Sequence, residues 1–176
     1  MNFEKTFIQG VYLVTGIPFE DFRGSFTRLY CEKEFYEAGI KQNFKQINLC
    51  NNINKGTLRG LHYQKGGKLE DKIVTCVNGK IFDVCVDIRQ DSPTYGRYIA
   101  EELSDRNRKM LYIPKGCAHG YVTLEDYSQI LYLMSEFYIP GLEAGYKYDD
   151  PMFGIQWPIK DNLIISDKDL TLPYIN

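Results

Sequence analysis

Residues 72–88 read Lys-Ile-Val-Thr-Cys-Val-Asn-Gly-Lys-Ile-Phe-Asp-Val-Cys-Val-Asp-Ile, and this stretch decides the fold class. Two runs rich in β-branched and aromatic residues, 72–77 and 80–88, flank the dipeptide Asn78-Gly79. Such residues favour strands, and Asn-Gly between two strand-like runs is typical of a tight hairpin turn. The sequence therefore predicts a β-hairpin whose two arms meet at Asn78-Gly79.

The second arm of this hairpin has two different faces, because successive side chains of a strand point to opposite sides. One face is apolar and consists of Phe82, Val84, Val86 and Ile88. The other face carries Asp83, Cys85 and Asp87. Two acids on one face of so apolar a strand indicate that this face borders either solvent or a polar cavity.

The rest of the chain continues the β pattern. Further strands are expected at 3–14, 26–31, 44–49, 56–64, 98–103, 109–113 and 129–138. A short helix is expected at 32–39, which ends on a glycine. Many short strands with one helix indicate an all-β barrel or jelly roll. At 176 residues, without internal repeats or a linker, the chain is expected to form a single domain, 1–176.

Charge and cysteine content exclude several classes of protein. The formal net charge is −2 without any block of like charge, so neither nucleic acid nor an anionic membrane is an expected partner. No segment approaches 18 consecutive apolar residues. The five cysteines contain no C-x-x-C pair, which argues against a disulfide framework and a thiolate zinc site. We therefore expect a protein of the reducing cytoplasm.

The run Gly56–Gln64 carries the best candidate for catalysis, His62. Arg59 precedes it by three residues and Lys72 follows it by ten. A side chain that titrates near neutral pH, flanked by cations, suggests proton transfer on an anionic substrate. A histidine that only packs in a barrel wall is the alternative. Strict alternation places Arg59 and His62 on opposite faces, and either a bulge at Gly60 or a phosphate bound where the strand bends would bring both into one site.

Several other site types are disfavoured by the motifs that are missing. The chain has two histidines and no H-x-H motif, so a three-histidine metal site of the kind found in double-sheet barrels cannot form. Phosphate-binding glycine motifs and a G-x-S-x-G elbow are also absent. What remains is cofactor-free acid–base chemistry. Tyr132 and Tyr138 are predicted on one face of the last long strand, where they could also be ordinary core tyrosines.

A series of short motifs resembles one known family. They are Asp21-Phe22-Arg23-Gly24, Gln46 with Asn48, 58–64, 83–89, 92–96, Ile113-Pro114, Ala118-His119-Gly120, Tyr132, Tyr138 with Pro140 and Glu143, Asp150, Trp157-Pro158 and Lys168-Asp169. In this order and spacing the chain resembles the dTDP-4-dehydrorhamnose 3,5-epimerases, from about Asp21 to Pro173. The resemblance implies a double-stranded β-helix, that is, a cupin-type jelly roll with short peripheral helices, that forms a homodimer and needs no metal or other cofactor.

The resemblance also implies the reaction. Such enzymes invert C3 and C5 of a nucleoside-diphosphate 4-keto-6-deoxy sugar, an isomerase reaction that supplies activated sugar for surface polysaccharide. The C4 ketone acidifies the hydrogens on both neighbouring carbons. The implied catalytic residues are His62 as the base, Asp169 as the group that orients it, Tyr132 as the acid on the opposite face and Lys72 as the stabiliser of the enolate oxygen.

The implied substrate-binding residues cover the rest of a nucleotide sugar. Arg23 and Arg59 would hold the diphosphate, with His119 and Lys168 nearby. Tyr138 would stack on the base, and Gln46, Asn48 and Glu143 would line the nucleotide end. Arg28 stands where relatives commonly carry Glu. A donor fork in place of an acceptor would change the preferred base, unless Arg28 only pairs with Glu20 or Asp21 on the surface.

Other departures from the resembling family leave the substrate open. Leu69-Glu70-Asp71 replaces a common Ala-Gln before the lysine, although no departure falls on the four implied catalytic positions. The alternatives are the same chemistry on a CDP- or GDP-linked 4-keto hexose or heptose, inversion at C3 alone, and a sugar-nucleotide-binding protein without catalysis. Matched acid and base groups argue against the last, because binding alone needs neither.

The expected absence of a metal leads to a direct test. Because two histidines and no chelating cluster are present, epimerase turnover should persist at its full rate after exhaustive EDTA treatment. The measurement is steady-state turnover before and after chelation. A loss of turnover that zinc or iron restores would contradict this expectation.

Overall fold

The computed structural model describes residues 1–175, and these form thirteen strands and two short helices. None of the helices in this range has the length and apolar character needed to cross a membrane. The elements are β1 (Asn2–Lys5), β2 (Tyr12–Thr15), β3 (Pro18–Asp21), β4 (Gly24–Thr27), α1 (Glu32–Glu37), β5 (Gln46–Asn51), β6 (Leu58–Gln64), β7 (Lys72–Asn78), β8 (Lys80–Asp87), β9 (Tyr98–Ser104), β10 (Lys109–Ile113), β11 (Cys117–Thr123), β12 (Gln129–Met134), β13 (Glu143–Gly145) and α2 (Asp167–Leu170). The all-β prediction is confirmed.

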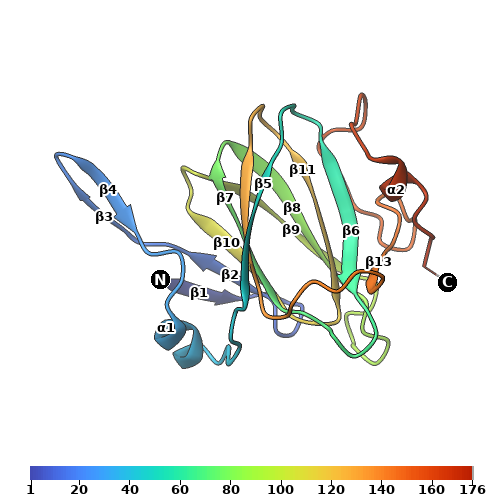
Figure 1. Ribbon diagram of the computed structural model, residues 1–176, viewed down its shortest axis with the longest axis horizontal. Coiled ribbons are helices and arrows are strands. Elements are labelled where there is room, and N and C mark those ends of the chain that lie inside the picture. The colour runs from blue at the N-terminus through green and yellow to red at the C-terminus, as the bar shows by residue number, and fades with distance from the viewer. Residues whose placement is uncertain (176) are drawn as a thin grey trace.

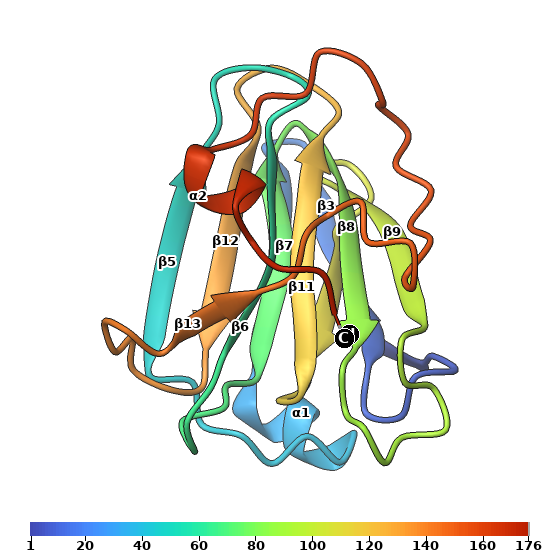
Figure 2. The same cartoon turned by 90° about the vertical axis from the view of Figure 1, so that its right-hand side faces the viewer.

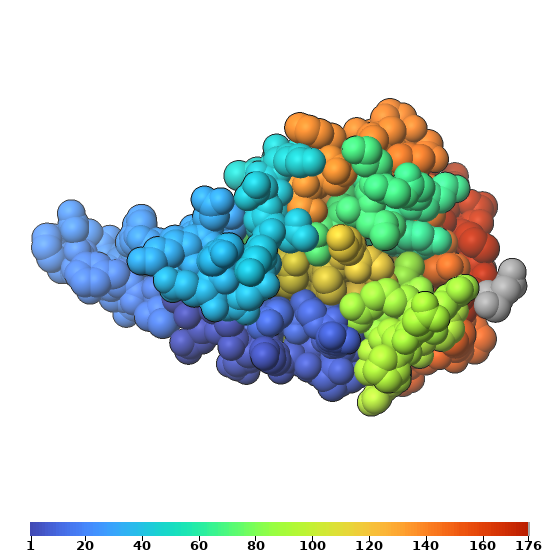
Figure 3. Space-filling model, turned by 90° about the horizontal axis from the view of Figure 1, so that it is seen from below, coloured from blue at the N-terminus to red at the C-terminus, as the bar shows by residue number. Residues whose placement is uncertain are grey.

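Two antiparallel sheets face each other and enclose the core (Figures 1 and 2). The larger sheet has the order β1-β2-β10-β7-β12-β5, and the smaller has the order β13-β6-β11-β8-β9. The remaining two strands, β3 and β4, pair only with each other and project from the barrel as an arm (Figures 1 and 3). This double-sheet arrangement agrees with the predicted cupin-type jelly roll.

The predicted hairpin at Asn78-Gly79 is wrong. A turn does occur there, with φ of +75° at Gly79, but β7 belongs to the larger sheet and β8 to the smaller. The segment around Ser128 lies between the two strands, and its hydroxyl accepts from the Lys80 amide at 3.3 Å. The Asn78 side chain donates to the carbonyl of Tyr127 at 2.8 Å. The turn is therefore a corner between the two sheets, and it cannot be distinguished from a hairpin by local pattern.

Three apolar clusters hold the layers together. The first lies between the sheets and includes Val74 of β7, Cys85 of β8 and Ile130 of β12, all at most 2% exposed. The second lies behind the smaller sheet, where the chain after β13 covers it with Phe153 and Trp157. Burial of such a side chain contributes about 1.5–3 kcal/mol. Both faces of the smaller sheet are consequently fixed, which holds the strands that carry His62 and His119 in place.

The third cluster joins α1 to the outer face of the larger sheet. Phe35 is 1% exposed, and its ring centroid lies 5.0 Å from that of Phe3. The helix ends before Gly39, which has φ of +92°, a conformation that favours glycine. The prediction of a short helix at 32–39 is therefore confirmed.

Some predicted strands differ in length. The run 3–14 is interrupted near Gly10 and forms the pair β1 and β2. The strand 129–138 ends at Met134, because Ser135 turns its hydroxyl to the Asp71 amide at 2.7 Å. The run predicted at 26–31 is a strand only to Thr27.

A bulge at Gly60 brings Arg59 and His62 to the same face of β6. His62 pairs with His119 and Arg59 pairs with Tyr121, so two residues of β6 lie opposite Gly120 alone. Such an extra residue reverses the alternation beyond it. Of the two explanations that the sequence left open, the bulge is the one that the structure shows, and both side chains face the space between the sheets.

We expect Gly60→Ala to destabilise the protein by about 2–4 kcal/mol. A Cβ at Gly60 would lie 2.6 Å from the Cα of Gly120 and from the His119 oxygen, which are backbone atoms of β11. Gly39→Ala is the matched control, because its φ is also positive but nothing lies within 4 Å of the added carbon. Denaturant unfolding measures both variants. Equal losses would contradict a clash at the bulge.

Candidate active site

A cleft of about 520 Å³ opens between the β5–β12 side of the larger sheet and β6 of the smaller. Its walls come from five elements and two connecting segments. The residues that line it are Gln46, Asn48, His62, Tyr63, Gln64, Glu70, Met134, Tyr138, Glu143 and Lys168. Six of these belong to the predicted site: Gln46, Asn48, His62, Tyr138, Glu143 and Lys168. The short helix α2 lies beside β6 and contributes Lys168 (Figure 2).

His62 and Asp169 form a hydrogen-bonded pair at the wall of this cleft. The Nε2 of His62 lies 2.8 Å from the Asp169 Oδ1, and the other carboxylate oxygen accepts from the Gly60 amide at 3.1 Å. Burial would raise the pKa of Asp169, but these hydrogen bonds outweigh it, and the pKa lies below its ordinary value. The carboxylate stays charged and orients the ring. Because Nε2 faces Asp169, Nδ1 is the nitrogen left for the cleft.

A second histidine–carboxylate pair lies deeper between the sheets. His119 Nε2 is 2.6 Å from the Asp83 Oδ1, and Asp83 is fully buried. Burial raises the pKa of Asp83 and outweighs the opposing effects of His119 and Lys72. The Asp83 Oδ2 has no hydrogen-bond partner among the described residues. Of the two surroundings predicted for the acidic face of 80–88, the polar interior is the correct one.

Tyr132 faces this interior from the opposite sheet. It lies on β12, between Asn48 of β5 and Val74 of β7, and its ring centroid is 6.0 Å from that of His119. Burial raises its pKa well above the ordinary value, so the hydroxyl keeps its proton. His62 and Tyr132 therefore approach the space between the sheets from its two sides.

Lys72 lies at the start of β7, and its side chain is only 7% exposed. Its Nζ is 3.0 Å from the Glu70 Oε1. Arg59 donates from Nε to the Asn52 Oδ1 at 3.0 Å, and the Tyr121 hydroxyl donates to the same oxygen at 3.1 Å. Neither cation is among the residues that line the cleft, and each is held by a polar partner.

The outer end of the cleft is built around Tyr138. Its amide donates to the Gln46 Oε1 at 2.7 Å, and its hydroxyl donates to Glu143. This hydrogen bond and backbone donors lower the pKa of Glu143 to about 2. The Tyr138 residue is 59% exposed, which leaves a ring face free for stacking. The prediction that Tyr138 shares a strand face with Tyr132 is wrong, because β12 ends four residues earlier.

Arg23 and Arg28 lie outside this cleft in a single chain. Arg23 is in the arm and pairs with Asp21 at 2.6 Å, and its side chain is 76% exposed. Arg28 follows the arm and pairs with Glu34 at 2.9 Å, not with the predicted surface partners. Their assignment to substrate binding stays a prediction that requires a second copy of the chain.

The partners of the predicted residues were missed from the sequence. Asp83 could have been found from the acidic face of 80–88, and Glu70 from its position two residues before Lys72. Asn52 and Gln64 carry no such signal, because amides in turns and strands are common. Within residues 1–175 no group of three or more His, Cys, Asp or Glu side chains could hold a metal ion.

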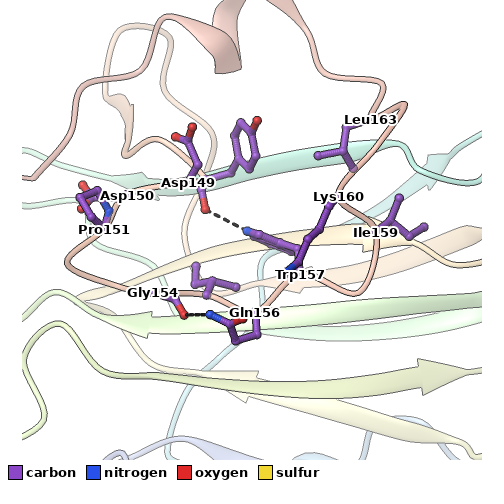
Figure 4. Close-up of a pocket in the computed structure, with 11 residues that line it drawn as sticks. Asp149, Asp150, Pro151, Gly154, Gln156, Trp157, Ile159, Lys160 and Leu163 are labelled. Atoms are coloured by element: carbon purple, nitrogen blue, oxygen red, sulfur yellow. Dashed lines mark hydrogen bonds between the residues drawn. The ribbon is translucent and has the colours of Figure 1, made fainter.

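A second cavity, of about 260 Å³, is formed by the segment after β13 (Figure 4). Figure 4 shows its lining folded onto itself, with the Trp157 Nε1 donating to the Tyr148 carbonyl at 2.9 Å. The carboxylate of Asp150 accepts from the amides of Met152 and Ile175. These polar groups hydrogen-bond to the protein's own backbone, so this cavity is not the active-site candidate.

Comparisons with known proteins agree with this geometry. The family model described as dTDP-4-dehydrorhamnose 3,5-epimerase matches residues 5–176. A relative of that name from Salmonella typhimurium is 39% identical over 98% of this chain and 94% of its own length. Another, from Methanothermobacter thermautotrophicus, is 41% identical over 96% of this chain and 91% of its own length.

Solved structures match over nearly the whole chain. The epimerase of Bacillus anthracis, with TDP and PPi bound, gives a TM-score of 0.96 at 36% identity and covers 99% of both chains. The Legionella pneumophila enzyme, in complex with dTDP-4-keto-L-rhamnose, gives 0.94 at 35% identity, covering 98% of this chain and 92% of its own. A model match over almost all residues and relatives near 40% identity place the sequence without ambiguity. This chain belongs to the dTDP-4-dehydrorhamnose 3,5-epimerase family.

Proposed function

We propose that this protein converts dTDP-4-dehydro-6-deoxy-D-glucose to dTDP-4-dehydro-L-rhamnose by inverting C3 and C5. The observation that carries this proposal is the His62–Asp169 pair at the cleft wall, with the protonated Tyr132 on the facing sheet. An epimerase needs a base on one side of the sugar ring and an acid on the other. Relatives named for this reaction along the full chain support the same substrate.

The proposed steps use side chains alone. The C4 ketone acidifies the hydrogen on the neighbouring carbon, and His62 removes it while Asp169 stabilises the imidazolium. The electrons move to the C4 oxygen, where the ammonium of Lys72 offsets the developing charge. Tyr132 then returns a proton to the opposite face of the carbon. Before the second carbon reacts, His62 releases the proton it took and Tyr132 regains one, both by exchange with solvent water. The same two steps at the other carbon beside the ketone then complete the reaction.

The remaining residues bind the nucleotide end. Tyr138 stacks on the base, and Gln46, Asn48 and Glu143 form the wall around it. Arg59 contributes positive charge for the diphosphate, with His119 and Lys168 nearby. The exposed ring of Tyr138 beside a polar wall supports this orientation of the substrate.

Replacing the proposed base should stop proton removal without weakening nucleotide binding. In His62→Asn, deuterium exchange from D₂O at C3 and C5 should fall by about 10²–10⁴-fold, since general acid–base catalysis contributes about that much. NMR measures the exchange, and calorimetry with dTDP measures binding. Exchange within tenfold of the parent would exclude His62 as the base.

Tyr132→Phe is the matched variant, because it removes the acid and leaves the base. Its enolate can be reprotonated from the His62 side, so exchange should continue while inversion stops. Loss of exchange together with inversion would contradict this division of roles.

We also propose that the chain acts as a homodimer through the arm. Phe22 is 98% exposed, Phe19 71% and Phe26 69%, and all three lie in the arm, whose two strands pair only with each other. Strand β5 is a free edge of the larger sheet next to the cleft. A second copy that receives the arm at this edge would bury the phenylalanines and bring Arg23 toward its cleft.

Subunit mixing tests this arrangement. Arg23→Ala and His62→Asn should each have little activity alone. An exchanged 1:1 mixture should regain about a quarter of the parent activity, because half of the dimers are mixed and each has one complete site. No gain, in a mixture shown by mass spectrometry to contain mixed dimers, would place Arg23 in its own chain's site.

One solved structure supports a second candidate reaction. A 3′-monoepimerase from Streptomyces bikiniensis has a similar structure, with a TM-score of 0.89 at 29% identity, covering 96% of this chain and 85% of its own. This supports inversion at C3 alone as the second candidate. Offering dTDP-, CDP-, GDP- and UDP-linked 4-keto sugars, with stereochemistry followed by NMR, distinguishes the candidates.

The proposed site of action is the cytoplasm, and all five cysteines are free, which supports this location. The proposed organisation of the chain is a single domain, 1–176.

A further inference from the structure

We propose that Glu70 is a positioning residue for this reaction: its carboxylate holds the ammonium of Lys72 in place at the part of the cleft that His62 lines. The inference rests on the proposed function, because Glu70 is assigned a role through Lys72. It adds a residue that neither acts on the substrate's protons nor binds the nucleotide.

The contact between the two side chains is short and shielded. Lys72 Nζ lies 3.0 Å from the Glu70 Oε1, and the side chains are 7% and 12% exposed. Glu70 lines the cleft with His62, whereas Lys72 is not among the lining residues. A buried ammonium is unfavourable unless it is paired, so the carboxylate keeps the charge of Lys72 in place beside the cleft.

The other groups around Lys72 do not fulfil this role. Asp83 of β8 interacts with Lys72 electrostatically, but its Oδ1 lies 2.6 Å from His119 of β11. Tyr132 of β12 keeps its proton and carries no charge. Within residues 1–175, Glu70 is the only carboxylate within 4.0 Å of the Lys72 Nζ. The charge of Lys72 next to the cleft therefore depends on one neighbour.

This pairing has a chemical consequence for the enolate. An ammonium has three N–H donors, and a single contact with Glu70 leaves two for the C4 oxygen. Holding the long lysine side chain before substrate arrives also reduces the freedom that is lost when the oxyanion forms. Glu70 thus acts on the charge-stabilising step and not on nucleotide affinity.

Glu70→Gln tests the charge, because glutamine has nearly the same shape. Without its carboxylate partner, the long lysine side chain is no longer held beside the cleft before the oxyanion forms. The value of kcat should therefore fall by about tenfold, because the charge-stabilising step loses a preorganised donor. The affinity for dTDP should stay within twofold. The measurements are turnover and exchange at C3 and C5, and calorimetry with dTDP.

Glu101→Gln is the matched control, since Glu101 pairs with Lys109 at 2.9 Å away from the cleft. Its kcat should equal that of the parent. If Glu70→Gln does not fold, Glu70→Asp, which keeps the charge but draws it back by one methylene group, should show a smaller loss of kcat. An unchanged kcat, or a loss that comes with weakened dTDP binding, would overturn the inference. A parent protein without exchange on any substrate would overturn the proposed function instead.

Discussion

The arrangement of the site depends on the carboxylate of Asp169. One oxygen accepts from His62 and the other from the backbone of Gly60, at the bulge that turns Arg59 and His62 to one face. The same side chain therefore holds both the His62 ring and the backbone bulge that turns this ring toward the cleft. Ser166 begins the helix that carries Asp169, because its hydroxyl accepts from the Asp169 amide at 3.2 Å. A helix of four residues thus has a precise position against β6.

Much of the fold follows from local pattern. Short alternating strands and a glycine-terminated helix predicted the all-β class. The family roles of Arg59 and His62 in one site made a bulge at Gly60 one of two explanations, and the register shows that bulge. The corner at Asn78-Gly79 shows where local pattern fails. Both a hairpin and a corner need the same turn residues, and only the positions of distant strands decide between them. Sheet membership is a long-range property that two adjacent strands do not encode.

The residues of the candidate site also differ in how far the sequence predicted them. Residues with distinctive chemistry, such as His62 and Tyr138, lie at the cleft as their family motifs implied. The partners that orient them were not assigned from the sequence. Asp83 and Glu70 had only their positions as a signal, and Asn52 had none, because amides in turns are common. Arg23 of the arm and Arg28 directly after it lie outside the cleft of their own chain. Their proposed role in binding therefore depends on a second copy of the chain.

The proposed base, His62, and the proposed acid, Tyr132, belong to different sheets, and packed side chains such as Val74 and Ile130 separate those sheets. Interiors are close-packed, so a change of one methylene group in this layer alters the distance between the sheets. That distance determines which face of a sugar ring each group can reach. Stereochemical outcome within such a barrel can therefore diverge through substitutions in the core, while every residue that touches the substrate stays the same.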